Sequence, residues 1–169
     1  MPEYTIRNFK SFLGNEGHGF NLSLYRDGIK VAFVIDSANG GDFEYSWEDR
    51  ERPQVDIHIT GWEGKPVTFK GTPEEKIFRE FCESLPEVKN DIDSSMMKVD
   101  DDLFISRLID EHLSKQWIQK KLKKFFLFQI GNDIGTSKYQ TIPRNPNTTQ
   151  EKVIEFIGKK YPNQKFKLV

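Results

Sequence analysis

The sequence has a single cysteine, Cys82, among its 169 residues, and it has no long apolar run. One cysteine excludes an intramolecular disulfide and any zinc finger built on cysteine ligands, which agrees with a reducing intracellular setting. A membrane-spanning helix needs roughly 18 consecutive apolar residues, and no stretch approaches that length. The first residues also lack a basic region followed by an apolar one, as a secretory signal would have. We therefore expect a soluble, cytoplasmic protein.

Acidic residues are scarce in the last third of the chain. Residues 115–169 contain twelve Lys and Arg but only three acids, whereas residues 1–114 contain thirteen bases and twenty-three acids. The net charge of −1 therefore hides two oppositely charged parts. Such a split indicates either a surface for an anionic partner or pairing between the parts. Because exposed ion pairs contribute only about 0–1 kcal/mol each, we expect separate charged faces.

Alternating apolar and polar residues predict antiparallel β-structure over the first 70 residues. The alternation lies on both sides of Asp27-Gly28, which is a strong hairpin signal because the tight turn needs positive φ angles. A second turn is expected at residues 39–42, and Val55, Ile57 and Ile59 form one apolar face of a later strand. These patterns predict a meander of four or five strands.

Helical spacing replaces the alternation at Thr72. Thr72-Pro73-Glu74-Glu75 is a capping box with proline at the first helical position, and the helix should end by Pro86. Residues 87–99 are polar and irregular and are expected to form a mobile connector. A longer helix should begin in the run Asp100-Asp101-Asp102, whose carboxylates suit the positive end of the helix dipole, and continue to about Lys124.

The remaining chain predicts a strand at 125–130, a return strand at 138–142, a helix capped by Thr148 or Thr149 and an edge strand at 165–169. The fold class is therefore α+β: an antiparallel β-meander, two helices and a C-terminal β-hairpin–helix–strand unit. Its parts are the meander with its capping helix at 1–86, the connector at 87–99 and the basic part at 100–169. We expect these parts to pack as one domain.

The order of these elements resembles small, uncharacterised α+β accessory proteins encoded by phages and plasmids. The resemblance rests on the turn with Gly40-Gly41 and the aromatic residues behind it, the helix ending Ser84-Leu85-Pro86, the lysine cluster, the hairpin and the closing helix that ends in residues 159–162. It implies a mobile-element protein of a bacterial host that interferes with a host process, as counter-defence inhibitors do.

Lysines and aromatic residues are interleaved near the end of the long helix. Such a surface holds phosphates on its lysines while aromatic rings stack on bases. The alternative is a solvated helix face whose lysines offset the dipole. The candidate binding residues are Lys115, Trp117, Lys120, Lys121, Lys123, Lys124, Lys138 and Arg144. The four lysines at 120–124 point to more than one side of a helix, so a single ligand cannot contact all of them.

Candidate catalytic residues are fewer. Asp56 and His58 lie on the same side of one strand, a spacing that suits a metal site or an acid–base pair, and Glu63 with Lys65 has the shape of an acid-x-lysine nuclease motif. The alternatives are a polar outer strand face and a turn. Neither a complete metal-ligand set nor a phosphate-binding loop is evident, and no cofactor is expected.

These observations favour a non-enzymatic protein that binds a host protein, a nucleic acid or a nucleotide ligand through the basic C-terminal third. The first alternative is a metal-dependent phosphodiesterase or nuclease that uses Asp56, His58 and Glu63. The second alternative is a DNA-binding regulator, although neither a helix-turn-helix nor a basic arm is evident.

Overall fold

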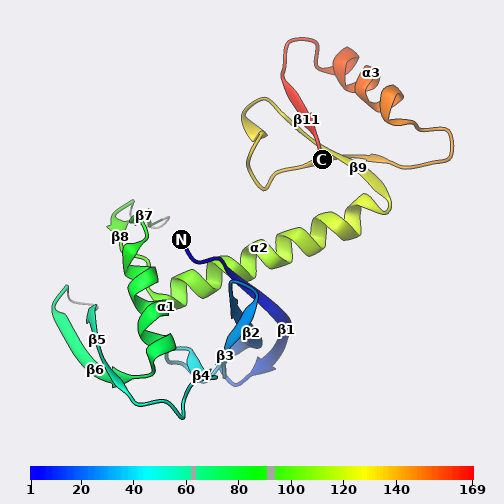
Figure 1. The fold of residues 1–169 in the computed structure, drawn as a ribbon. Coiled ribbons are helices and arrows are strands. Elements are labelled where there is room, and N and C mark those ends of the chain that lie inside the picture. The colour runs from blue at the N-terminus through cyan, green and yellow to red at the C-terminus, as the bar shows by residue number, and fades with distance from the viewer. Residues whose placement is uncertain (62–63, 91–93) are drawn as a thin grey trace. The chain divides into compact units, whose positions relative to one another are not determined.

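The computed structural model describes residues 1–61, 64–90 and 94–169. It contains both helices and antiparallel strands, which confirms the α+β class (Figure 1). The chain forms two compact units, residues 1–110 and residues 111–169. Among the described residues, no helix combines the length and the apolar composition needed to cross a membrane.

The first unit is built on a four-stranded antiparallel sheet. Its strands pair in the order β1 (Tyr4–Gly14), β2 (Gly17–Arg26), β3 (Ile29–Asp36) and β4 (Glu44–Trp47). Asp27 and Gly28 join β2 to β3 with φ angles of 51° and 81°, as the tight hairpin turn requires. The predicted hairpin at this turn is confirmed.

The length of β1 exceeds what the alternation of Tyr4 and Ile6 predicted. The register of β1 against β2 shifts between Arg7 and Lys10, where Asn8 has a positive φ of 57°. This bulge reverses the faces of the residues that follow, so the alternation in the sequence stops although the strand continues to Gly14.

The strand at residues 55–60 does not continue the meander. β5 (Val55–Thr60) pairs only with β6 (Pro66–Gly71), and the two form a separate hairpin. Ile57 of β5 is fully buried, because this hairpin packs on α1 (Pro73–Ser84). The predicted run of four or five strands is therefore a sheet of four strands followed by a hairpin of two.

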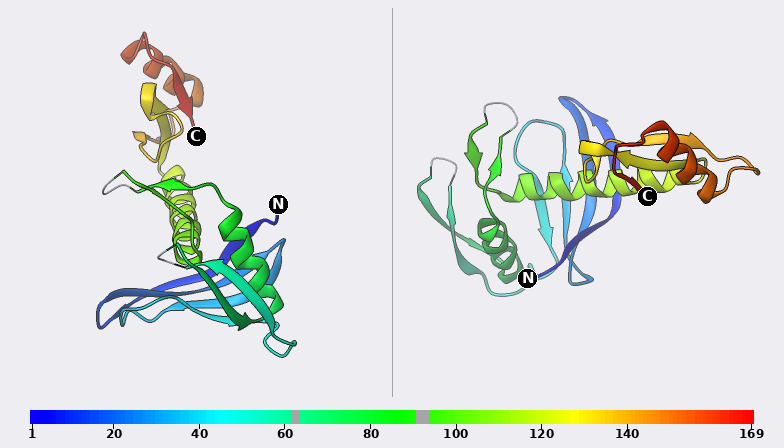
Figure 2. Two further views of the ribbon diagram at one scale, coloured as in Figure 1. Left: turned by 90° about the vertical axis from the view of Figure 1, so that its left-hand side faces the viewer. Right: turned by 90° about the horizontal axis from the view of Figure 1, so that it is seen from above.

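Helix α1 and the first half of α2 (Asp101–Leu122) cover one face of the four-stranded sheet (Figure 2). Thr72 caps α1 by accepting the Glu75 N–H at 3.1 Å, which confirms the predicted helix start. Aromatic rings fill the space between sheet and helices: Phe78 of α1 lies 5.2 Å from Tyr4 and 6.0 Å from Phe104, centroid to centroid. Burial of this cluster is the main stabilising contribution in the unit.

The predicted connector at 87–99 contains a short pair of strands, β7 (Val88–Lys89) and β8 (Met96–Met97). It ends in Val99, which is only 1% exposed, so the segment is anchored at that point. Asp100 then caps α2 by accepting the Leu103 N–H at 2.8 Å. The long helix begins within the predicted Asp run and ends two residues before Lys124.

The second unit starts inside α2 and adds a three-stranded antiparallel sheet. Its strands are β9 (Phe125–Ile130), β10 (Gln140–Pro143) and β11 (Phe166–Leu168), with β9 in the centre. A single 3-10 turn, η1 (Gly131–Asp133), follows β9, and α3 (Gln150–Lys160) precedes β11. Val153 and Ile157 of α3 pack on Phe126 and Phe128 of β9. The hairpin, the last helix and the edge strand are where the sequence predicted them.

The unit boundary, between residues 110 and 111, lies within α2 and not in the segment 87–99. The first half of α2 belongs to the first unit because Ile105 and Ile109 are buried in the aromatic cluster there. Helical continuity across the boundary leaves no composition change in the sequence to mark it. The expectation that both parts pack as one domain stays a prediction.

The carboxylate of Asp102, near the start of α2, is disfavoured in its charged form by its surroundings. Asp102 is half-buried, and burial, together with the neighbouring charge of Asp101, raises the pKa of its carboxyl group to about 6. Asp100 and Asp42 add to the rise, while the Phe43 N–H, which donates to Asp102 at 3.4 Å, opposes it. The favourable helix dipole expected at this position is therefore outweighed by burial and repulsion.

We predict that Asp102→Asn stabilises the protein at pH 7.5. Because the folded-state pKa exceeds the ordinary value of 3.8, ionisation disfavours the fold above pH 6, and the wild type gains stability as the pH falls from 6 towards 4. A rise of about two pKa units corresponds to about 3 kcal/mol of destabilisation by the ionised group. Because solvent screens a half-buried group, we expect the variant to gain about 1 kcal/mol. Thermal melts should show a gain at pH 7.5 that disappears near pH 4. Glu44→Gln, which removes an exposed charge from the same unit, is the control; a lower melting temperature for Asp102→Asn at pH 7.5 would contradict the assignment.

Candidate functional site

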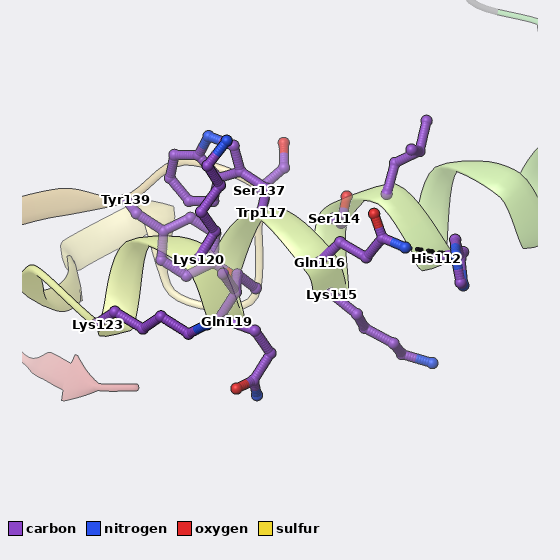
Figure 3. A pocket seen from close by; sticks show the side chains of 12 residues that line it. His112, Ser114, Lys115, Gln116, Trp117, Gln119, Lys120, Lys123, Ser137 and Tyr139 are labelled. Atoms are coloured by element: carbon purple, nitrogen blue, oxygen red, sulfur yellow. Dashed lines mark hydrogen bonds between the residues drawn. The ribbon is translucent and has the colours of Figure 1, made fainter. Parts of the chain in front are cut away.

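A concave surface of the second unit lies along the C-terminal half of α2. It is a groove of about 1140 Å³ (Figure 3). One wall is formed by the helix and the other by the loop that leads into β10. The lining residues are His112, Leu113, Ser114, Lys115, Gln116, Trp117, Ile118, Gln119 and Lys120 of α2, Lys123 of the turn that follows it, and Ser137 and Tyr139 of the loop. No carboxylate lines the groove within the part of the chain that the structure describes.

Two aromatic rings join the walls of this groove. Trp117 of α2 packs on Tyr139 of the loop, with centroids 5.9 Å apart and ring planes tilted by 38°. Trp117 keeps 43% of its surface exposed. The amide of Gln116 lies one turn from His112, whose Nε2 is 2.8 Å from the Gln116 Nε2. The groove therefore offers an aromatic surface flanked by amides and hydroxyls.

Gln129 in the centre of β9 fixes the loop that forms the second wall. Its side chain is only 3% exposed. The amide nitrogen donates to the carbonyl oxygens of Thr136 at 2.6 Å and Lys138 at 3.3 Å, and the amide oxygen accepts the Gly135 N–H at 3.1 Å. These bonds hold residues 135–138 against the sheet and so place Ser137 and Tyr139 at the groove.

The structure brings half of the predicted binding residues together. Lys115, Trp117, Lys120 and Lys123 line the groove. The others do not: Lys121, Lys124, Lys138 and Arg144 lie outside the lining. Lys120 and Lys121 lie in the last turn of α2, about 100° apart around the helix, whereas Lys123 and Lys124 lie in the turn between α2 and β9.

The remaining predicted residues have local contacts of their own. Lys121 places its ammonium group 5.6 Å from the centroid of Trp117 and 5.4 Å from that of Phe125. Arg144 donates from Nε to the carbonyl oxygen of Phe125 at 3.1 Å and lies 4.0 Å above the ring of Phe126. These contacts are cation–π and hydrogen-bonding interactions that stabilise the unit.

Little negative charge offsets the lysines of the groove. Residues 111–169 contain twelve Lys and Arg but only four acids. The Nζ atom of Lys115 lies 3.6 Å from Glu111, in an exposed pair one helical turn long. Lys120 and Lys123 have no carboxylate within 4.0 Å among residues 111–169, all of which the structure describes. Within this unit the ammonium groups of Lys120 and Lys123 are available to a partner.

The candidate catalytic residues that the structure describes, Asp56 and His58, each contact a residue of β6. Asp56 and His58 both lie exposed on β5, as predicted. Asp56 pairs with Lys70 of β6 at 2.7 Å, and this bond lowers the pKa of the Asp56 carboxyl group. The Nδ1 atom of His58 lies 2.9 Å from the Thr68 hydroxyl group. Glu63 lies outside the described residues. Across residues 1–61, 64–90 and 94–169, no group of three His, Cys, Asp or Glu side chains is arranged to hold a metal ion.

Cys82 is buried in the aromatic cluster of the first unit. Burial, aided by the charge of Asp101, raises the pKa of its thiol to about 12. A thiol in this state is a poor nucleophile, so the interpretation of Cys82 as a structural residue agrees with its surroundings.

Sequence reasoning did not find the loop residues Ser137 and Tyr139 or the amides Gln116 and Gln119. Gln116 and Gln119 lie three positions apart on α2, but nothing in the sequence marked them as binding residues. Nothing in the sequence indicated that the loop with Ser137 and Tyr139 lies beside α2, because its position depends on hydrogen bonds to the buried Gln129. No family model matches the chain, and neither the curated proteins nor the solved structures include a significant match.

Proposed function

We propose that this protein is a non-enzymatic binding protein whose second unit holds an anionic partner in the groove along α2. The observation that carries the proposal is the lining itself: Lys115, Lys120 and Lys123 line the groove together with the partly exposed Trp117, and the lining contains no acid among the described residues. A concave site with positive charge raises the local concentration of anions and binds them by charge-assisted hydrogen bonds.

The context of the proposal is a phage or other mobile element. The resemblance to accessory proteins of phages and plasmids supports a protein that occupies a host macromolecule or sequesters an anionic ligand, in the manner of a counter-defence inhibitor. Such a protein acts by binding alone, and it requires a partner surface but no catalytic set. The groove meets this requirement.

Charge removal at the groove tests the proposal. We expect that replacing Lys115, Lys120 and Lys123 together by Gln weakens the binding of fluorescein-labelled heparin by about tenfold or more at low salt, since three exposed charge contacts contribute roughly 0.5 kcal/mol or more each. The dependence of binding on salt should also flatten, because fewer charges interact. Fluorescence anisotropy at several salt concentrations measures both effects.

The matched control is a second triple variant of the same unit, Lys124→Gln with Lys165→Gln and Lys167→Gln. It removes the same charge from exposed lysines outside the groove lining. We expect this control to keep most of the heparin affinity. Equal losses in the two triple variants would mean that total charge, and not the groove, determines binding, and the proposal would then be wrong.

A further inference from the structure

We infer that the partner of the groove is a single-stranded nucleic acid segment. The inference rests on the proposed function and names the chemistry of its ligand. It is carried by three features of the lining: the lysines near Trp117, the exposed aromatic surface and the hydroxyl group of Ser137 beside it.

Lysines near Trp117 supply the positive charge that binds a phosphate chain. Lys120 lies three positions after Trp117 on α2, and residues at this spacing share one side of a helix. Lys123 follows directly after the last residue of the helix, Leu122. Lys120 and Lys123 can therefore bind phosphates of a strand whose base stacks on Trp117.

The exposed aromatic surface favours a single strand over a duplex, because only a single strand has base faces that are free to stack on it. Trp117 and Tyr139 pack against each other, so no base fits between their rings, but the exposed 43% of Trp117 faces outward. Bases stack on such rings only where their faces are free, as they are in a single strand. Lys121, whose ammonium group lies 5.6 Å from the Trp117 centroid, is within reach of the phosphate of a base that stacks there.

The polar groups fit base edges better than they fit an acidic protein segment. Ser137 carries a hydroxyl group beside the aromatic surface, and this group, which both donates and accepts, bonds to base edges without requiring one sequence. Protein interfaces are depleted in lysine at their centres, whereas nucleic-acid interfaces are strongly positive. Three lysines in one groove therefore favour phosphates over the carboxylates of a protein.

The test measures binding of the full chain to a labelled 15-nucleotide oligo(dT) by fluorescence anisotropy. We expect micromolar affinity at low salt and at least about tenfold weaker binding to the dT·dA duplex of the same length. Trp117→Leu should weaken oligo(dT) binding by about tenfold, because stacking on one base is worth roughly that factor or more. The control is Phe156→Leu, an aromatic residue of α3 that is 50% exposed and outside the lining, and it should bind as the parent does.

A second measurement does not depend on the fold tolerating leucine at position 117. Stacking quenches indole fluorescence, so oligo(dT) should quench the parent protein and should quench Trp117→Phe much less. Unchanged oligo(dT) affinity in Trp117→Leu, equal quenching in Trp117→Phe, or stronger competition by a 15-residue polyglutamate than by oligo(dT) would each overturn the inference.

Heparin separates this inference from the proposed function. If heparin binds and responds to the groove lysines but oligo(dT) does not bind, the anion-binding function stands and the nucleic-acid inference is wrong. If neither probe binds the parent protein, both are wrong.

Discussion

Phe78→Ala is expected to lower the free energy of unfolding of the first unit by about 3–5 kcal/mol, the usual cost of removing a fully buried phenylalanine. Phe78 has no exposed surface. Its ring lies within 6.0 Å, centroid to centroid, of Tyr4, Tyr45, Trp47 and Phe104, so its removal leaves a cavity among rings from β1 and β4, the two edge strands of the sheet, and from α2. Such a cavity cannot close without displacing α1 from the sheet.

Urea denaturation followed by circular dichroism measures the loss, which should shift the midpoint without changing the slope. Phe33→Ala is the control, because Phe33 is 37% exposed on β3 of the same sheet and should lose far less. If Phe78→Ala does not fold, Phe78→Leu keeps most of the volume and should show a smaller loss in the same direction. Equal midpoints for Phe78→Ala and Phe33→Ala would contradict the central role of this ring.

Local signals in the sequence were sufficient to predict those elements that are stabilised by interactions between neighbouring residues. The hairpin at Asp27-Gly28 and the helix after Thr72 depend on turn and cap residues that lie beside them, and the structure has both. The strand 125–130 was also found, because β9 is central in its sheet and apolar at every position except Gln129.

Features that depend on distant contacts were not found. The separation of β5 and β6 from the four-stranded sheet reflects the packing of Ile57 on α1, which alternation along β5 does not reveal. The bulge at Asn8 is likewise specified by pairing with β2 and not by the residues of β1 alone. For the groove, helical spacing showed that the lysines at 120–124 do not all share one side, but neither the end of α2 at Leu122 nor the second wall was evident.

That second wall depends on Gln129, a polar residue in an otherwise apolar strand. A buried amide is costly unless its donors and acceptor are satisfied, and here loop atoms satisfy them. The sequence FFLFQI contains this polar residue, but it does not identify which segment bonds to it. The position of Tyr139 in the groove is therefore a consequence of one hydrogen-bonded side chain in the sheet.

Gln129→Met is expected to destabilise the second unit by about 3 kcal/mol. Methionine keeps the shape of glutamine but removes three hydrogen bonds, and buried groups that lose their partners cost about 1–3 kcal/mol each, partly offset here by water access to the freed loop. Thermal melts of the full chain should show a lower transition for this unit. Gln164→Met is the control, since Gln164 is exposed and the same change there should have little effect.

The same variant connects the fold to the groove. At a temperature where Gln129→Met is still folded, the freed loop should no longer hold Tyr139 against Trp117, and heparin and oligo(dT) should bind more weakly although every lysine is retained. Lost affinity in the folded variant means that the loop forms part of the binding surface. Parental affinity together with a lower melting temperature would show that Gln129 stabilises the sheet only, and that α2 alone makes the binding surface.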